Sequence, residues 1–183
     1  MTDWIAQLAS EDSAARVAAA EALYKQGCTL GEAAVAPWRA NPELSALLTG
    51  PPTVGVAVQP VNFEKIREAM GSPRLAEVPP DQYASEFELH LGEARLDILT
   101  TRGGGAIERF MEKFGEGIQQ IEYPVKNVDR ATQLLRERFA LEPVYSETRR
   151  GADGTRVNFF LVETFEGRKA LIELVEVSAR ERS

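Results

Sequence analysis

The stretch VGVAVQPVN at residues 54–62 has a counterpart in IEYPVKNVD at residues 121–129. In both stretches apolar residues fall on every second position before the pattern ends at Asn62 or Asp129. A period of two is typical of a half-buried strand, and Asn and Asp are favoured as helix N-caps. The two stretches therefore predict the same order of strand, turn and helix, repeated at a constant offset.

The repeat continues beyond these helices. The motif Leu96-Asp97-Ile98-Leu99 matches Ile172-Glu173-Leu174-Val175, and each motif is interpreted as the last strand of its copy. Alternating patterns predict further strands at 85–91 in the first copy and at 143–147 and 156–162 in the second. We therefore predict an α+β fold of two βαβββ modules, whose curved sheets form a cup with every second side chain pointing inward.

Residues 1–50 lack this alternation and instead predict a small segment of short helices. Gly27 is predicted to end one of these helices, because glycine often follows a helix C-terminus. The stretch RVAAAEAL at 16–23 resembles one HEAT-type helical repeat, which cannot bury its apolar face without a neighbour. Gly50-Pro51-Pro52 breaks the helical pattern, so we predict a helical segment at 1–50 and a sheet domain at 51–179.

The composition is that of a globular protein, with 44% hydrophobic and 27% charged residues in a chain of 183. The net charge of −7 argues against binding to nucleic acid, whose phosphates would repel the protein. Because no apolar run is long enough to cross a bilayer and residues 1–9 lack the basic start of a signal peptide, we expect no membrane association. A single cysteine, Cys28, fits the reducing cytoplasm, and the single histidine, His90, excludes a metal site built on two histidines of one chain.

Three motifs carry a family resemblance: FMEKFGEGIQQI at 110–121, RVNF at 156–159 and LIEL at 171–174. Together they resemble the vicinal oxygen chelate superfamily, which includes glyoxalase I and the bleomycin-resistance proteins. The most similar branch is that of methylmalonyl-CoA epimerase, and the resemblance covers residues 53–176. It implies paired βαβββ modules, a small-molecule substrate or ligand in the cup, and a homodimer.

In that superfamily four cup-facing residues bind a divalent metal: a His in each first strand, and a Glu or Gln in each last strand. The matching positions here are Thr53, Asp97, Gln120 and Glu173, so both histidines are absent. Carboxylate, amide and hydroxyl oxygens suit Mg²⁺, Mn²⁺ or Ca²⁺ rather than zinc, cobalt or nickel. The resemblance therefore implies either a weakly held metal of this kind or no metal.

Polar side chains crowd the face that the alternation points into the cup. The inward positions are Thr53, Glu86, Glu88, His90, Arg95, Asp97, Gln120, Glu122, Arg156, Asn158 and Glu173. Charges buried in an inert core cost several kcal/mol each, so this set indicates a wet cavity or an interface. Neighbouring carboxylates repel each other, which raises the pKa of at least one of them and makes it a better general base.

The resemblance and the alternation together assign roles on this face. Proton transfer falls to Glu86, Glu122 and Glu173, and substrate binding to Gln120, Arg95, Arg156 and Asn158. An isomerase or lyase that removes a proton next to a carbonyl would use such a set, with Glu173, Asp97 and Gln120 holding the metal or the enolate oxygen. Two alternatives stay open: a metal-free small-molecule binding protein of the bleomycin-resistance type, and a protein-interaction scaffold.

Overall fold

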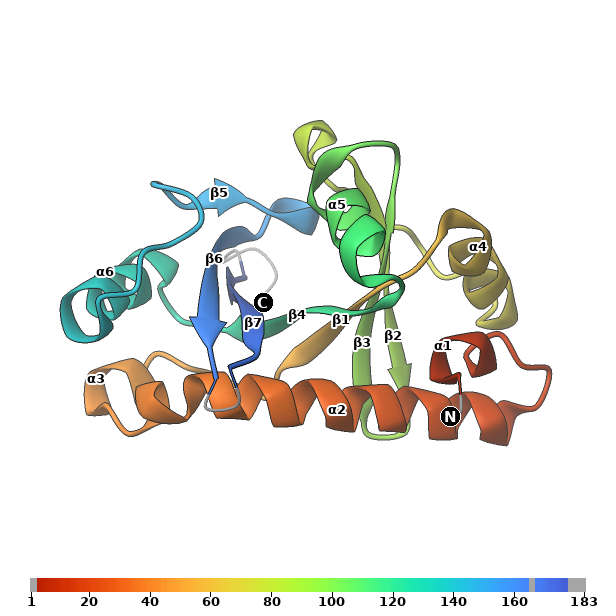
Figure 1. Cartoon of the computed structure of the whole chain (residues 1–183), viewed down its shortest axis with the longest axis horizontal. Helices are drawn as coiled ribbons and strands as arrows, with labels where there is room; N and C mark the ends of the chain where they lie inside the picture. The colour runs from red at the N-terminus through yellow and green to blue at the C-terminus, as the bar shows by residue number, and fades with distance from the viewer. Residues whose placement is uncertain (1–2, 165–166, 178–183) are drawn as a thin grey trace. The chain divides into compact units, whose positions relative to one another are not determined.

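The computed structural model describes residues 3–164 and 167–177, which group into two compact units. Unit 1 consists of Met1–Gly27 and Thr53–Gln119, and unit 2 of Cys28–Pro52 and Gln120–Ser183. Each unit therefore combines part of the N-terminal helical segment with one copy of the repeat (Figure 1). The predicted domain boundary after residue 50 stays a prediction, and the end of the predicted sheet domain, residues 178–179, lies outside the described residues.

In the described part of unit 1, the strands β2, β3 and β1 lie side by side in that order. They are β1 (Thr53–Ala57), β2 (Ala84–Leu91) and β3 (Ala94–Thr101). β2 and β3 form an antiparallel hairpin, and β1 pairs with β3 in parallel. The helical elements of the unit are α1 (Trp4–Gln7), α4 (Pro60–Ala69), the short η1 (Pro80–Gln82) and α5 (Gly105–Phe114). α4 packs on the sheet through Phe63. Its ring lies edge to face with that of Phe87, with 5.0 Å between the ring centroids.

The sheet of unit 2 follows the same plan with one more strand, in the order β4-β7-β6-β5. Its strands are β4 (Gly117–Pro124, in this unit from Gln120 on), β5 (Arg149–Arg150), β6 (Arg156–Glu163) and β7 (Lys169–Glu176). β4 pairs with β7 in parallel, while β6 is antiparallel to both β7 and β5. The helical elements are α3 (Pro42–Ser45), α6 (Val128–Phe139) and the short η2 (Ala152–Gly154).

The predicted repeat is confirmed at the level of strand register. Val54 lies opposite Leu96 in unit 1, and Ile121 lies opposite Ile172 in unit 2. These pairs join the residues that the sequence motifs matched, so Asp97 and Glu173 occupy equivalent places. The copies differ in one strand: unit 1 has no counterpart of β5 among its described residues, and there Ala76 N donates a hydrogen bond to Glu86 O.

In the helical segment, one long helix runs through the point where the sequence predicts a helix end. α2 runs unbroken over Ser13–Arg39, coloured red to orange in Figure 1, so the predicted helix end at Gly27 is wrong and the HEAT-type resemblance is not confirmed. Gly27 lies where α2 comes close to β1, since a Cβ there would be 2.4 Å from Val54 Cγ1. At Gly31, one turn later, a Cβ would be 2.6 Å from the Tyr123 hydroxyl. Close packing, rather than helix termination, explains both glycines.

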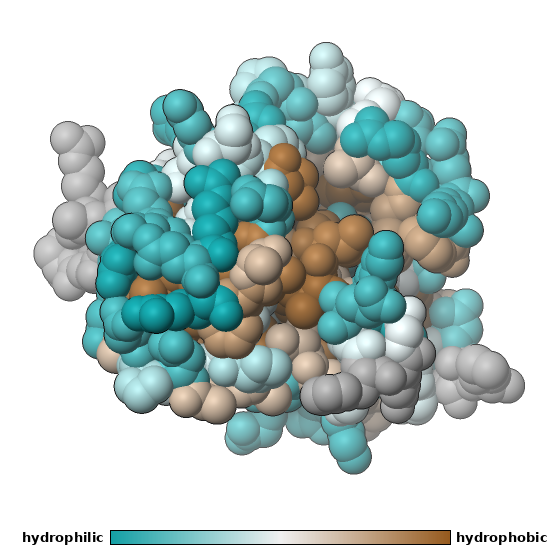
Figure 2. All heavy atoms as spheres, turned by 60° about the vertical axis from the view of Figure 1, so that its left-hand side comes forward, coloured by the Kyte–Doolittle hydropathy of each residue, from teal (hydrophilic) through white to brown (hydrophobic). Residues whose placement is uncertain are grey.

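Hydrophilic residues prevail on the face of the molecule that Figure 2 shows, in keeping with the charged composition. The apolar residues of the strands fill the interior, and Val54, Leu96, Ile121 and Ile172 are all almost fully buried. Within residues 3–164 and 167–177, no helix combines the length and the apolar character that a membrane span requires.

Candidate functional site

Three polar side chains of unit 2 meet where β4 lies beside β7. Glu122 pairs with Glu173 across the two strands, and Gln120 precedes Glu122 by two positions, so all three point to one face. Gln120 Nε2 donates to Glu173 Oε2 at 2.6 Å and to Glu122 Oε1 at 3.1 Å. Glu173 is only 7% exposed. One amide group therefore holds two carboxylates together in a partly buried place.

This arrangement, the Gln120–Glu122–Glu173 cluster, has defined chemical abilities. Two carboxylates at short range repel each other, and a shared hydrogen-bond donor offsets part of that repulsion. A carboxylate is a general base once a substrate proton comes within hydrogen-bond reach, and an amide N–H₂ group stabilises an oxygen on which negative charge develops. The cluster thus combines a base, or a pair of bases, with an oxyanion donor.

The predicted site residues of unit 1 lie on one face of its sheet. Residues directly opposite each other in an antiparallel pair share a face. The register places Glu86, Glu88, His90, Arg95 and Asp97 there, together with Thr53 of β1. Asp97 is 7% exposed, whereas Glu88 and His90 lie largely in solvent with Oε2 and Nε2 3.6 Å apart. The structure brings these six residues to one face, and their roles stay predictions.

The prediction that Arg156 and Asn158 share the face of Glu173 is wrong. Asn158 pairs with Leu174, and the residue opposite Glu173 is Phe159, so the predicted alternation is out by one position. The two residues point to the opposite face, where helix α6 lies. Their placement therefore gives no support to the substrate-binding role that the sequence assigned to them.

Both displaced residues have structural partners. Arg156 Nη2 donates to Asp129 Oδ2 at 2.6 Å and Nη1 to Glu176 Oε2 at 3.1 Å. Hydrogen bonds from Thr148 and Arg156 hold the pKa of Asp129 below its ordinary value. Asn158 is fully buried and donates from Nδ2 to Tyr145 O at 3.1 Å, while its Oδ1 accepts from Tyr145 N at 3.4 Å. These contacts fasten the 144–148 segment to the sheet.

That Thr53, Asp97, Gln120 and Glu173 hold a metal stays a prediction, and the donor arrangement in unit 2 argues against it. Thr53 and Asp97 belong to unit 1, and Gln120 and Glu173 belong to unit 2. In unit 2 the amide nitrogen of Gln120 faces the carboxylates, and that nitrogen is a donor, not a metal ligand. Across the described ranges, no three His, Cys, Asp or Glu side chains group so that they could hold a metal ion. The amide takes the position beside the carboxylates that a cation would need.

Glu116, in the FGEG part of the family motif, has a role that the sequence does not reveal. Its Oε1 accepts from Gln59 N at 2.6 Å and from Asn62 Nδ2 at 2.8 Å. The carboxylate therefore caps the first turn of α4, where backbone N–H groups lack helical partners. The distance in sequence between residue 116 and α4 hides this contact from local patterns.

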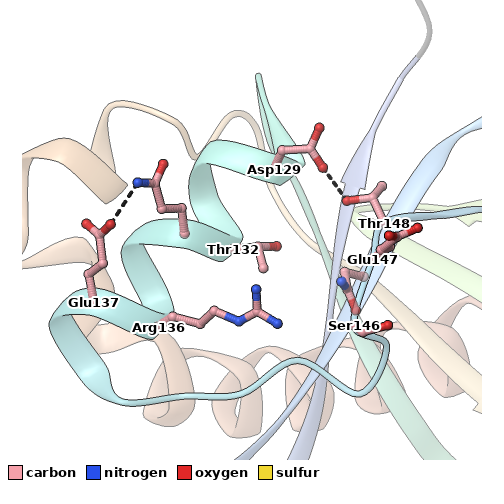
Figure 3. A pocket seen from close by; sticks show the side chains of 9 residues that line it. Asp129, Thr132, Arg136, Glu137, Ser146, Glu147 and Thr148 are labelled. Carbon is pink, nitrogen blue, oxygen red and sulfur yellow. Dashed lines mark hydrogen bonds between the residues drawn. The ribbon is translucent and has the colours of Figure 1, made fainter.

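A pocket of about 360 Å³ in unit 2, lined by residues of polar types, was also missed. It lies between α6 and the 146–148 segment (Figure 3). Thr132 and Arg136 line it from α6, and Ser146 and Thr148 line it from the segment. No sequence motif marks this pocket, because residues with ordinary helix and loop patterns come together only in the folded unit.

Comparison with known proteins gives matches among solved structures. Methylmalonyl-CoA epimerase from Mycobacterium tuberculosis is 30% identical over 75% of this chain and 94% of its own, with a TM-score of 0.62. A variant of Streptomyces coelicolor methylmalonyl-CoA epimerase in complex with 2-nitronate-propionyl-CoA is 27% identical over 72% of this chain and 96% of its own, with a TM-score of 0.60.

A third structure, methylmalonyl-CoA epimerase in complex with methylmalonyl-CoA and NH₄⁺, is 26% identical over 72% of this chain and 96% of its own, with a TM-score of 0.59. No protein-family model and no curated protein matches the chain. The matched epimerase structures are covered almost completely.

Proposed function

The chain belongs to the vicinal oxygen chelate superfamily, which contains the methylmalonyl-CoA epimerases, and from this membership we propose that it binds a small acyl thioester and moves a proton at the carbon next to the carbonyl group. The matched structures with bound molecules hold coenzyme A esters of this type. The proposed activity is that of an isomerase.

The observation that carries the proposal is the contact of one amide with two carboxylates in the Gln120–Glu122–Glu173 cluster. An isomerase of this kind needs a base for the proton and a donor for the oxygen that becomes negative. Glu122 is the proposed base, because its hydrogen bond from Gln120 Nε2 is the longer one, at 3.1 Å against 2.6 Å for Glu173. Glu86 of unit 1 stays a predicted base, and the proposal for the cluster does not depend on it.

The proposed reaction conserves all atoms. A carboxylate oxygen takes the proton from the carbon next to the carbonyl, and the electron pair of the C–H bond moves to the carbonyl oxygen as an enolate. To stabilise that oxygen, Gln120 exchanges one of its two hydrogen bonds to a carboxylate for a hydrogen bond to the enolate. The enolate then takes a proton back at the same carbon from a carboxylic acid, which returns the site to its starting charge. Return of the proton by the same carboxyl group restores the configuration, whereas a proton delivered by a second acid to the opposite face inverts it.

We propose that this proton transfer needs no tightly bound metal. The support is the donor geometry of Gln120 described above, which stabilises the paired carboxylates in place of a cation. A weakly held Mg²⁺, Mn²⁺ or Ca²⁺ is the competing expectation. Metal analysis of untagged protein, followed by Mn²⁺ titration of the melting temperature, separates the two: a rise that Glu173→Ala and Asp97→Ala abolish would contradict the metal-free proposal.

The test of the activity is exchange of the proton with solvent. Methylmalonyl-CoA incubated with the protein in D₂O should gain deuterium at the carbon next to the thioester, followed by ¹H NMR. Glu122→Gln should slow the exchange by about 100-fold or more, because a positioned base contributes at least that factor. Glu163→Gln, an exposed change on β6, is the matched control and should have no effect.

A metal-free binding protein is the second candidate function. It is favoured by the fact that the Gln120 donors are already engaged by carboxylates. Stabilisation of the protein by propionyl-CoA with no deuterium exchange would support this candidate and exclude the isomerase. If neither stabilisation nor exchange occurs, both proposals are wrong.

The remaining expectations concern assembly and location. The superfamily resemblance supports a homodimer, and the single cysteine supports a cytoplasmic protein. Light scattering on the purified chain tests the first expectation, since a monomer mass at all concentrations would contradict it.

A further inference from the structure

We propose that the pocket between α6 and the 146–148 segment binds a small oxyanion, a carboxylate or a phosphate, through Arg136, Thr132 and Ser146. The pocket belongs to unit 2, and its lining contains none of the cluster residues Gln120, Glu122 or Glu173. The proposal is therefore separate from the proposed isomerase activity and stands if that activity is absent.

Thr132 is the first reason to expect a ligand. The residue is only 7% exposed, and its Oγ1 has no hydrogen-bond partner within residues 3–164 and 167–177. A buried hydroxyl without a partner is unfavourable, so such groups are rare and call for an explanation. In Figure 3 this hydroxyl points toward the 146–148 segment. Because solvent does not reach its oxygen in the free protein, an acceptor bound in the pocket contacts it once the side chain turns about its Cα–Cβ bond.

Arg136 supplies the positive charge. Its Nε donates to Glu142 Oε2 at 3.1 Å, and this pair is open to solvent. The two Nη groups have no protein acceptor in the described part of the chain. Figure 3 shows the guanidinium pointing from α6 into the pocket, on the side of Ser146. Guanidinium groups bind carboxylates and phosphates through two parallel hydrogen bonds. The Nη groups of Arg136 are placed to make such bonds to an oxyanion in the pocket.

Of the three carboxylates that line the pocket, Asp129 is paired with a cation, and the other two point away from the Arg136 guanidinium. Asp129 is paired with Arg156 at 2.6 Å and accepts from Thr148. Glu137 accepts from Gln133 at 2.7 Å on the outer side of α6. The Glu147 carboxylate lies beside Thr148 in Figure 3, away from the Arg136 guanidinium. The groups that point inward are therefore one cation and hydroxyl donors.

The wall of the pocket is fixed before any ligand binds. Val144 N donates to Phe159 O at 2.7 Å, and Asn158 bonds both the N–H and the C=O of Tyr145. These contacts hold the segment that carries Ser146 against β6. A site that is already formed loses little entropy when a small ion binds.

The experiment is a ¹H–¹⁵N NMR titration of the full chain with inorganic phosphate and, separately, with acetate, against sodium chloride of equal ionic strength. We expect saturable shifts of the Thr132, Arg136 and Ser146 signals with at least one of the two oxyanions. Arg136→Gln should weaken binding about tenfold, the loss expected for a hydrogen bond to a charged group. Arg138→Gln, on the same helix but paired with Glu43, is the matched control.

Thr132→Val separates binding from folding. The change removes an unpartnered hydroxyl and keeps the side-chain shape, so the melting temperature of the free protein should stay the same or rise, while anion binding weakens. Shifts that do not saturate, or binding that survives unchanged in both Thr132→Val and Arg136→Gln, would overturn the proposal. Binding of phosphate alone or of acetate alone supports the proposal and shows whether the pocket takes a phosphate or a carboxylate.

Discussion

At the centre of the hairpin in unit 1 the buried residue facing the helices is Phe87, and at the equivalent position in unit 2 it is Asn158. The equivalence follows from register, since Phe87 pairs with Ile98 and Asn158 with Leu174. Phe87 packs on α4, whereas Asn158 fastens the 144–145 segment by hydrogen bonds. One fold position is used for apolar packing in one unit and for a polar anchor in the other.

The opposite faces of the two sheets differ in the same way. In unit 2 the pair on neighbouring strands is Glu122 and Glu173, and in unit 1 the equivalent pair is Gly55 and Asp97. Only the second copy therefore holds two carboxylates side by side at this position. A duplicated fold keeps its register because register decides which side chains are buried, while the polar residues on it are free to diverge.

The largest expected effect comes from removing Phe87, the apolar residue of the pair compared above. Phe87→Ala removes a fully buried ring and leaves a cavity, so the free energy of unfolding should fall by about 3–5 kcal/mol. Urea unfolding followed by circular dichroism measures it. Phe114→Ala is the matched control, because this phenylalanine is 65% exposed and should change stability by less than about 0.5 kcal/mol. Equal losses in the two variants would contradict the assignment of Phe87 to the core.

The hydrogen bonds of Asn158, the polar residue of the pair, are tested by Asn158→Leu. Leucine fills the same space and makes no hydrogen bonds. Both backbone groups of Tyr145 would lose their partner, and the free energy of unfolding should fall by about 2–3 kcal/mol. Hydrogen exchange should localise the effect, because the Tyr145 amide should exchange faster while amides of unit 1 stay protected. An unchanged Tyr145 amide would mean that Val144 and its bond to Phe159 alone hold the segment.

The contact of α2 with each copy predicts whether replacing its glycines with alanine raises or lowers the stability of the protein. On helix propensity alone, Gly27→Ala and Gly31→Ala should stabilise the protein by about 1 kcal/mol each. The new Cβ would instead meet the stiff side chain of Val54 in one unit and Tyr123 with Ile121 in the other. We therefore expect losses of about 1–2 kcal/mol in thermal unfolding. Gly117→Ala, with open space around the new Cβ, is the control, and stabilisation by the helix changes would refute close packing.

The same residues show how far the sequence reaches. The register of the two copies could be predicted because alternating apolar residues must all face the core, and that pattern is local. The continuity of α2 could not, because a glycine that ends a helix and a glycine that permits close approach look alike without Val54 in view. Asn158 was assigned to the wrong face because a polar residue on an alternating strand is assumed to avoid the core. Asn158 can be buried because its amide group exchanges hydrogen bonds with the backbone of Tyr145.

The smallest expected effect concerns how α2 is held in unit 2, where polar contacts join the close packing at Gly31. Burial raises the pKa of the Tyr123 hydroxyl, which stays protonated and donates to Glu32 Oε1 at 3.1 Å. The hydrogen bond from Arg39 holds the pKa of Glu32 below its ordinary value of 4.5. Because the folded pKa lies below the unfolded one, the stabilisation is complete above pH 4.5 and disappears as the pH falls through the folded pKa.

Glu32→Gln measures this contribution. The side chain is 47% exposed, so solvent screening should keep the effect below about 1 kcal/mol at pH 7. Urea unfolding at pH 7 should show the unchanged protein as more stable than the variant, and at pH 3 the difference should shrink, because the Glu32 carboxylate then takes up a proton. Glu163→Gln, the loss of an exposed carboxylate on β6, is the control at pH 7. A Glu32 difference that grows on acidification would mean that the carboxylate opposes folding, and that Gly31 packing alone holds α2 to β4.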